Sequence, residues 1–289
     1  MLIDFIHVGY PKSGSTWLQN NIFPNIPNLC ILNPIDTSLG LFFLDEFVFD
    51  NHLKFDKSLF INKFRDYTSS NLNCTNNSIL GISEENLLGD VFNGKDVKLL
   101  AEKIKYTFGS PQILFILRSQ PSLIISTYSQ YVFHGGTLSF NNYINNYNTE
   151  GWRLFHKLNF NLTIKLYAEV FGHNNLNIYF LEDIVADPKK LNSFFSKFDI
   201  ELNESCLSSS NKSRNKGFSF RESHLRRHFN KFSIRLNQII PSVSSSSNSE
   251  IRHLITKYPS EFSILSDSNL ELADNFKLSL PPSYVFNLH

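Results

Sequence analysis

The first eighteen residues carry the feature that most constrains the fold, a short apolar run followed by a loop of glycine and hydroxyl residues. Residues 3–8 are mainly β-branched and aromatic, which predicts a buried strand. Gly9, Pro11 and Gly14 then punctuate a turn, and apolar residues return at helical spacing from Trp17. We therefore expect a strand, a tight loop and a helix.

A loop of this kind is suited to phosphate. It points several backbone N–H groups in one direction, at the positive end of a helix whose first donors have no partner within the helix. Gly14 lets the backbone approach an anion closely, and Lys12 supplies a mobile positive charge. The loop adds three hydroxyl donors, those of Ser13, Ser15 and Thr16.

The position of the lysine distinguishes this loop from the general P-loop. Gly9 and Gly14 have the P-loop glycine spacing, but Ser15 stands where a P-loop has its lysine. The octapeptide YPKSGSTW, residues 10–17, resembles the 5′-phosphosulfate loop of the sulfotransferases. These enzymes transfer a sulfuryl group from 3′-phosphoadenosine-5′-phosphosulfate (PAPS) to an acceptor hydroxyl or amine. The resemblance implies a PAPS site formed by Lys12, Ser13, Gly14, Ser15, Thr16 and Trp17.

The composition indicates a globular chain without general affinity for polyanions. Of its 289 residues, 42% are hydrophobic and 14% aromatic, which is ample material for a core. Lys and Arg number 27 against 26 Asp and Glu, so the net charge is +1. This balance predicts no general attraction to nucleic acid or to an anionic membrane. Any anion site must be local.

Cysteine usage and apolar runs indicate where the protein acts. Three widely spaced cysteines without a C-x-x-C pair predict reduced thiols rather than a disulfide framework or a metal site. No apolar run approaches the ~20 residues that span a bilayer, and the chain does not start with a secretory signal. We expect a cytoplasmic protein with no membrane span and no metal.

Strands and helices alternate along the chain. Apolar runs predict strands at 78–82, 112–117 and 176–181; amphipathic or capped segments predict helices at 39–49, 54–67, 96–108, 139–147, 159–171, 188–198 and within 251–276. This alternation predicts an α/β, three-layer, P-loop-like fold with a central parallel sheet flanked by helices. We expect one domain over 1–289, its cofactor-binding core covering about 1–200 and loops and helices over 201–289 completing the site.

An arginine at the end of a buried strand suggests a second phosphate site. Arg118 follows the run 112–117 and presents a planar fork of donors matched to phosphate. Pro121 then opens a helix, and Ser126 lies within it. By themselves, Arg118 fits an ion pair and Ser126 a bond to its own backbone. In sulfotransferases an Arg and a Ser at this spacing bind the 3′-phosphate of PAPS, which implies that role here.

A late loop matches the same family in part. Many sulfotransferases close over the 3′-phosphate with Arg-Lys-Gly, whereas this chain has Asn215 before Lys216 and Gly217. The resemblance implies cofactor binding by Lys216 and Gly217, with Arg214 as a substitute for the missing arginine. The alternative is a solvated basic loop.

The chemistry requires a cation and a base. Sulfuryl transfer, like phosphoryl transfer, depends on positioning and on positive charge at the leaving oxygen, a role that suits Lys12. Glu85 resembles the strand-end base of bacterial carbohydrate-type sulfotransferases, and we favour it over Glu84 and expect its pKa to be raised. Alternatively both acids cap the following helix. His134 is the second candidate base, although it also suits the acceptor mouth.

Other features leave the function partly open. Cytosolic sulfotransferases stack a Tyr of Tyr-Glu-Asp on adenine, but this chain has Leu181 there, so Trp17 is the candidate. The acceptor is expected to be a carbohydrate or small metabolite, and the product adenosine 3′,5′-bisphosphate; the sequence indicates no nucleic-acid partner and no oligomeric state. The alternatives are a nucleotide kinase, which would need Mg²⁺, and a non-catalytic nucleotide-binding protein.

Overall fold

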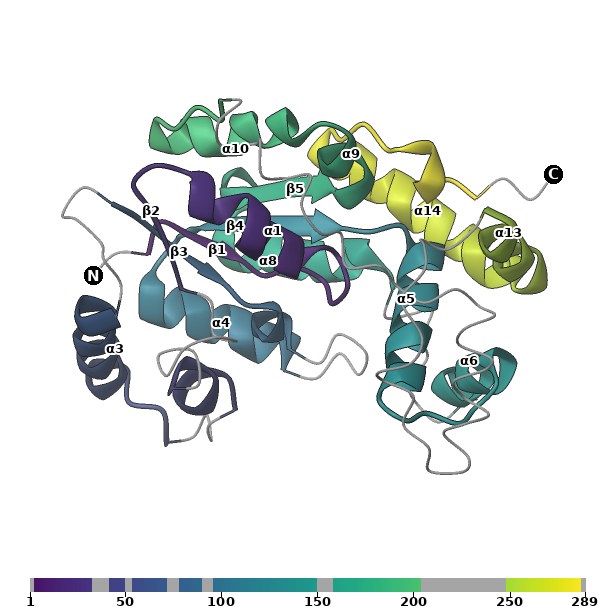
Figure 1. Cartoon of the computed structure of the whole chain (residues 1–289), viewed down its shortest axis with the longest axis horizontal. Coiled ribbons are helices and arrows are strands. Elements are labelled where there is room, and N and C mark those ends of the chain that lie inside the picture. The colour runs from purple at the N-terminus through teal and green to yellow at the C-terminus, as the bar shows by residue number, and fades with distance from the viewer. Residues whose placement is uncertain are drawn as a thin grey trace. The chain divides into compact units, whose positions relative to one another are not determined.

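The structure is a computed structural model and describes residues 3–32, 42–49, 54–71, 78–89, 96–149, 158–203 and 248–286. The chain divides into two compact units, and Figure 1 labels the elements that they contain. The first is drawn from Met1–Leu117 and Leu162–Lys212, and the second from Arg118–Asn161 and Ser213–His289. The single domain expected from the sequence stays a prediction.

The first unit contains a parallel sheet of five strands in the order β2-β3-β1-β4-β5. The strands are β1 Phe5–His7, β2 Leu29–Leu32, β3 Ile79–Ser83, β4 Gln112–Leu117 and β5 Leu176–Phe180. The central strand β1 pairs with β3 on one side and β4 on the other, so that Phe5 lies opposite both Gly81 and Gln112. From β1 the chain runs first to one edge and later to the other, and ligands of open α/β sheets gather at such a reversal.

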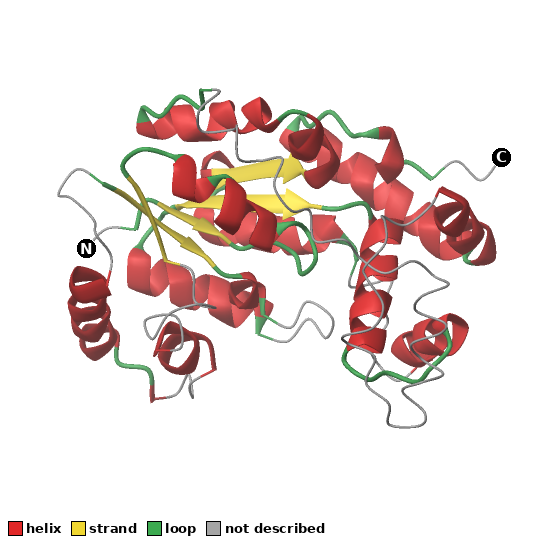
Figure 2. Cartoon of the chain, in the orientation of Figure 1, coloured by secondary structure: helices red, strands yellow, loops and turns green. Residues whose placement is uncertain are grey.

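Helices cover both faces of the sheet, as the sequence predicts (Figure 2). Leu114 and Ile116 of β4 belong to a buried apolar cluster with side chains of α1 Ser15–Asn21, α9 Leu181–Ala186 and α10 Asn192–Phe195. Phe115, between them in sequence, contacts Tyr167 of α8 Phe160–Phe171, with ring centroids 5.1 Å apart. Successive residues of a strand point to opposite faces, so this is the predicted three-layer α/β fold with a central parallel sheet.

The remaining elements of the first unit pack around this sheet. Its long helices are α3 Lys57–Asn71 and α4 Val97–Phe108, and its short elements are η1 Phe23–Asn25, η2 Leu44–Phe49, η4 Glu85–Leu88, η5 His173–Asn175, η6 Pro188–Leu191 and η7 Ser196–Phe198. The helix predicted over 39–49 is described from residue 42, and Leu44–Phe49 forms a π-helix. Phe47 of η2, Phe60 of α3 and Phe108 of α4 are in ring contact, so phenylalanines join these three helices.

The second unit is helical. Its elements are α5 Gln120–Phe133, α6 Phe140–Thr149, α13 Asn248–Lys257, α14 Pro259–Phe276 and η9 Pro282–Tyr284. Two buried amides pair across it, since Gln120 Nε2 donates to Asn269 Oδ1 (2.8 Å) and Asn269 Nδ2 to Gln120 Oε1 (3.2 Å). Tyr128 packs edge-on against Phe140. These contacts tie α5 to α14 and to α6.

The structure differs from the sequence-based expectations at β2 and at Cys30. The edge strand β2 is not among the predicted strands, because the prolines that flank it indicate a loop; its side chains are mostly half-buried. Cys30 in β2 is disulfide-bonded, so the expectation of reduced thiols is wrong for this cysteine. In the described part of the chain, no helix has the length and apolar character needed to cross a membrane.

Candidate active site

The loop between β1 and α1 has the tight backbone that the sequence predicts. The N–H of Ser13 donates to the carbonyl of Tyr10 (3.1 Å), and the N–H of Leu18 donates to the carbonyl of Gly14 (3.0 Å). Lys12 and Gly14 are left-handed, with φ of 66° and 89°. Left-handed residues beside ordinary ones turn backbone N–H groups to one side, and such concave backbones bind anions.

Gly14 is required here for two reasons. Its positive φ is one that other residues adopt only at a cost. A Cβ at this position would also lie 2.6 Å from Cδ1 of Leu181, the first residue of α9. Leu181, which stands where the sequence resemblance expects a tyrosine against adenine, packs against the loop.

Two hydroxyls of the loop are buried without a partner. Ser13 is fully buried and Ser15 is 8% exposed, and neither Oγ has a hydrogen-bond partner among the described residues. A buried polar group left unsatisfied costs about 1–3 kcal/mol. An oxyanion bound by the loop would supply the missing partners, so these residues fit a phosphosulfate group.

The other loop residues have different environments. Lys12 is partly buried and Thr16 is exposed. Trp17 is a partly buried side chain packed against the apolar cluster that contains Leu18 and Phe23. The position of Trp17 is therefore that of a core residue of α1, and stacking on adenine stays a prediction for it.

Glu84 caps the short helix η4. Its carboxylate Oε1 accepts a hydrogen bond from the backbone N–H of Asn86 (2.8 Å) and another from the Asn86 side chain. The residue is 2% exposed, and burial raises its pKa above the usual range. Of the two acids that the sequence places here, Glu84 is the one that has the capping role.

Glu85 is the partly buried neighbour of this cap. Burial raises the pKa of the Glu85 carboxyl, the charge of Glu84 raises it further, and the positive charge of Lys12 lowers it. The expected direction of the pKa shift is confirmed. Lys12 and Glu85, which follow neighbouring strands, are brought within electrostatic range of one another.

A buried polar group around Ser83 was not predicted from the sequence. Nδ1 of His7 and Oγ of Ser83 are 2.8 Å apart, and Gln19 Nε2 donates to both the carbonyl and the Oγ of Ser83 (3.0 Å each). Burial lowers the pKa of His7 to about 4. The one sequence feature that marks this group is a histidine within an otherwise apolar strand. These contacts join β1, β3 and α1, the elements that carry the loop and the two acids.

The residues predicted to bind the 3′-phosphate belong to the second unit. Arg118 directly follows β4, and Ser126 lies in the middle of α5; both are partly buried. His134 is the exposed C-cap of α5, and its ring lies 5.4 Å from that of Phe133. Arg214, Lys216 and Gly217 lie outside the described residues.

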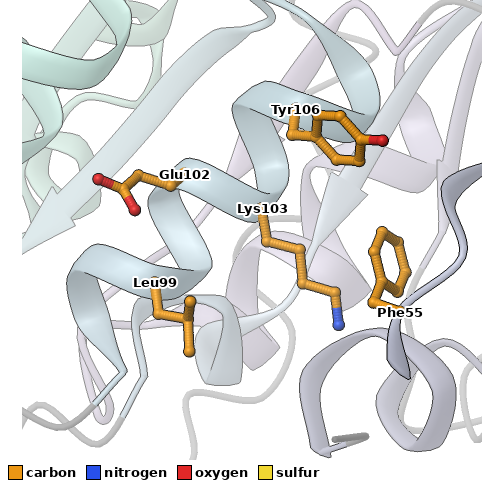
Figure 3. A pocket seen from close by; sticks show the side chains of 5 residues that line it. All are labelled: Phe55, Leu99, Glu102, Lys103 and Tyr106. Atoms are coloured by element: carbon orange, nitrogen blue, oxygen red, sulfur yellow. The ribbon is translucent and has the colours of Figure 1, made fainter. Parts of the chain in front are cut away.

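The structure also has a pocket beside helix α4, and it is lined by none of the residues discussed above. It has a volume of about 260 Å³ and is lined by Phe55, Leu99, Glu102, Lys103 and Tyr106 (Figure 3). The Lys103 ammonium donates to the carbonyl of Phe47 and lies 4.0 Å from the Phe55 ring centroid. Its charged group is thus already satisfied by protein groups, and no predicted site residue lines the pocket.

Comparison with known proteins bears on the fold. No protein-family model matches the chain, and no curated protein matches its sequence significantly. Among solved structures, the sulfotransferase from Alicyclobacillus acidocaldarius superimposes with a TM-score of 0.55 at 13% identity, covering 97% of this chain and 98% of that chain. The chain has a sulfotransferase fold.

Two further solved structures that match the chain are also sulfotransferases. Mouse sulfotransferase SULT7A1 complexed with PAP matches with a TM-score of 0.49 at 14% identity, covering 95% of this chain and 87% of that one. The sulfotransferase domain of the Synechococcus PCC 7002 olefin synthase matches with a TM-score of 0.46 at 14% identity, covering 97% and 96%. At these identities the similarity concerns the fold, and the chemistry must be argued from the residues.

Proposed function

We propose that the protein is a sulfotransferase that moves a sulfuryl group from PAPS to a hydroxyl or amine of an acceptor. The observation that carries the proposal is the pair of buried, unpartnered hydroxyls of Ser13 and Ser15 in a loop that also holds Lys12. A loop with these groups fits an oxyanion at the carboxyl end of a central strand. The sulfotransferase fold is consistent with this assignment.

Each predicted residue has a role in binding. The loop residues Lys12, Ser13 and Ser15 would hold the 5′-phosphosulfate, and Arg118 with Ser126 would hold the 3′-phosphate. Arg214, Lys216 and Gly217 are proposed as a third contact. PAPS, when bound, supplies an activated sulfuryl group attached to a phosphate leaving group.

Two residues would act on the reaction itself. The Lys12 ammonium stabilises negative charge that develops on the leaving oxygen, since a preorganised cation acts most strongly where charge appears. Glu85 accepts the proton of the acceptor, and its raised pKa makes it a stronger base than an ordinary carboxylate. His134 remains the second candidate for the base.

The proposal includes a class of acceptor. We propose a carbohydrate or small metabolite as acceptor, by resemblance to the bacterial carbohydrate-type branch. A cytoplasmic location was expected from the sequence, but the Cys30 disulfide weighs against it, because disulfides persist mainly in oxidising compartments.

Ligand-dependent thermal unfolding tests the site. We expect adenosine 3′,5′-bisphosphate to raise Tm by a few degrees without metal, since a ligand at ~100 times its Kd adds about 2.7 kcal/mol. The double variant Ser13→Ala/Ser15→Ala should lose this rise, whereas Ser196→Ala, an exposed control, should keep it. Stabilisation only by ATP with Mg²⁺ would indicate a kinase and contradict the proposal.

Turnover separates an enzyme from a binding protein. Release of adenosine 3′,5′-bisphosphate from PAPS is measured with pooled sugars and small hydroxylated metabolites as acceptors. The proposal expects release by the wild type and strongly reduced release by Glu85→Gln. Equal rates for the two proteins, in spite of bisphosphate binding, would support the non-catalytic alternative.

A further inference from the structure

His7 is a buried histidine with one ring nitrogen engaged and one unpartnered. It lies in the central strand β1 and is 1% exposed. Its Nδ1 is 2.8 Å from Ser83 Oγ, while its Nε2 has no hydrogen-bond partner among the described residues. A buried ring nitrogen of this kind calls for an explanation.

The contacts of Ser83 favour one tautomer of His7. Ser83 Oγ accepts a hydrogen bond from Gln19 Nε2 (3.0 Å), and a hydroxyl can still donate its single proton. Donation to His7 Nδ1 satisfies both groups and leaves the ring proton on Nε2. The opposite tautomer would leave the Ser83 proton without an acceptor among these contacts. His7 therefore presents an N–H donor at Nε2.

This donor and the Ser15 hydroxyl lie against the same backbone position. A Cβ built on Gly9 would be 2.8 Å from His7 Nε2 and 3.0 Å from Ser15 Oγ. Gly9, which has no Cβ, thus leaves room for both atoms. Both atoms are buried and both lack a partner in the described part of the chain.

We propose that His7 is a positioning residue for the anion loop: once an oxyanion is bound, its Nε2–H donates to Ser15 Oγ, and the Ser15 proton is thereby directed to the oxyanion. This inference rests on the proposed function, because it assigns a device to the same phosphosulfate site. Gln19, Ser83, His7 and Ser15 then form one directed chain of donors that ends at the ligand. Each hydroxyl in such a chain both accepts and donates, and the bonds polarise one another.

Neutrality suits His7 to this role. Burial lowers its pKa to about 4, so the imidazole stays uncharged at neutral pH and keeps a single N–H to donate. The charge on the ligand is met by Lys12, and His7 sets the direction of a hydroxyl.

Two substitutions of His7 separate this role from a purely structural one. The amide nitrogen of Gln reaches about as far as Nε2, whereas the amide of Asn reaches only as far as Nδ1. His7→Gln therefore keeps the donor toward Ser15, and His7→Asn keeps only the contact with Ser83. We expect His7→Gln to bind adenosine 3′,5′-bisphosphate within about twofold of the wild type, and His7→Asn to bind about tenfold more weakly, the loss of one hydrogen bond to the site.

Calorimetry measures these Kd values, with the exposed His173→Asn as the matched control. A purely structural role through Ser83 predicts the reverse order, with His7→Asn near the wild type, and that result would overturn the inference. A wild type that does not bind the bisphosphate would instead overturn the proposed function together with the inference. Binding by the wild type and by both variants alike would overturn the role of His7 alone.

Nitrogen NMR on the wild type covers the case in which a His7 variant does not fold. We expect the His7 Nε2 signal to have the chemical shift of a protonated nitrogen and to move when adenosine 3′,5′-bisphosphate is added. The movement should be lost in Ser15→Ala. An unprotonated Nε2, or a signal that moves equally in Ser15→Ala, would contradict the proposal.

Discussion

The ammonium of Lys12 counteracts the rise in the pKa of Glu85 that burial and the neighbouring Glu84 produce. Lys12 lies in the loop after β1, and Glu85 begins the helix after β3, the strand beside β1 in the sheet. Parallel pairing of these strands brings the two ends together. The cation and the base proposed for the reaction are therefore electrostatically coupled before any substrate is present.

Replacing Lys12 tests the role of the cation. We expect Lys12→Ala to lower kcat by roughly 10²- to 10³-fold, the usual loss for one transition-state contact. Its Glu85 should also titrate at higher pH, because a nearby positive charge is gone. Steady-state kinetics over a range of pH measure both effects, with the exposed Lys98→Ala as control. An unchanged kcat in Lys12→Ala would remove Lys12 from the chemistry.

The two acids give different pH profiles if Glu85 is the base. The base must be ionised, so kcat/KM should rise with pH as Glu85 loses its proton, in a range above the usual carboxyl pKa. Glu85→Gln should abolish this acidic limb. Glu84→Gln removes one cause of the raised pKa of Glu85 and should move the limb to lower pH.

Glu84→Gln is also the matched control for folding, because glutamine keeps an oxygen that can accept from the Asn86 N–H. Unfolding of both variants in urea should show whether any loss of activity reflects a loss of structure. A profile of Glu85→Gln with the wild-type acidic limb would transfer the role of base to another residue, of which His134 is the next to test.

His7 should make stability depend on mild acid. Its pKa is about 4 in the folded chain against 6.5 unfolded, so below pH 6.5 the unfolded chain binds a proton that the folded chain does not. The free energy of unfolding should fall by about 3 kcal/mol between pH 6.5 and 4, at about 1.4 kcal/mol per pH unit. Above pH 6.5 this contribution is constant.

Urea unfolding of the wild type and His7→Gln at several pH values measures this difference. The variant should lack the part of the acid destabilisation that belongs to His7, while His173→Gln, at an exposed position, should retain it. Parallel curves for the wild type and His7→Gln would show that His7 is not buried as a neutral ring.

Arg118 should act on cofactor affinity more than on the chemical step. We expect Arg118→Ala to raise KM for PAPS. A contact with the 3′-phosphate, far from the reacting sulfur, stabilises the ground state and the transition state equally. Ser126→Ala should give a smaller change in the same direction, and the exposed Arg252→Ala none. A wild-type KM in Arg118→Ala would exclude Arg118 from the cofactor site.

Local patterns in the sequence predict much of this fold. Strands β1 and β4 are predominantly apolar, and the loop residues Lys12 to Gly14 belong to one recognisable octapeptide. The edge strand β2 is a run of only four apolar residues, Leu29–Leu32, and the prolines on either side of it indicate a loop. Leu181 begins helix α9, whereas the apolar run 176–181 predicts that it ends the strand.

The contacts of His7 could not be predicted in the same way. His7 and Ser83 lie opposite each other in the register of β1 and β3, 76 residues apart in sequence. Neither residue belongs to a motif, and their pairing depends on which strands are neighbours. The same holds for the division of roles between Glu84 and Glu85, which follows from where η4 begins.

Gly14 provides a last test of the loop, because its two constraints can be separated. Gly14→Ala should destabilise the fold, since its φ of 89° costs about 1–2 kcal/mol for a residue with a Cβ and that Cβ would lie 2.6 Å from Leu181 Cδ1. Leu181→Ala removes the second constraint and leaves the first. In a double-mutant cycle followed by urea unfolding, the two changes together should therefore cost less than their sum. Strict additivity would mean that Leu181 of α9 and residue 14 are not in steric conflict. Binding of the bisphosphate by Gly14→Ala at wild-type affinity would show that the loop does not need glycine at this position to bind the anion.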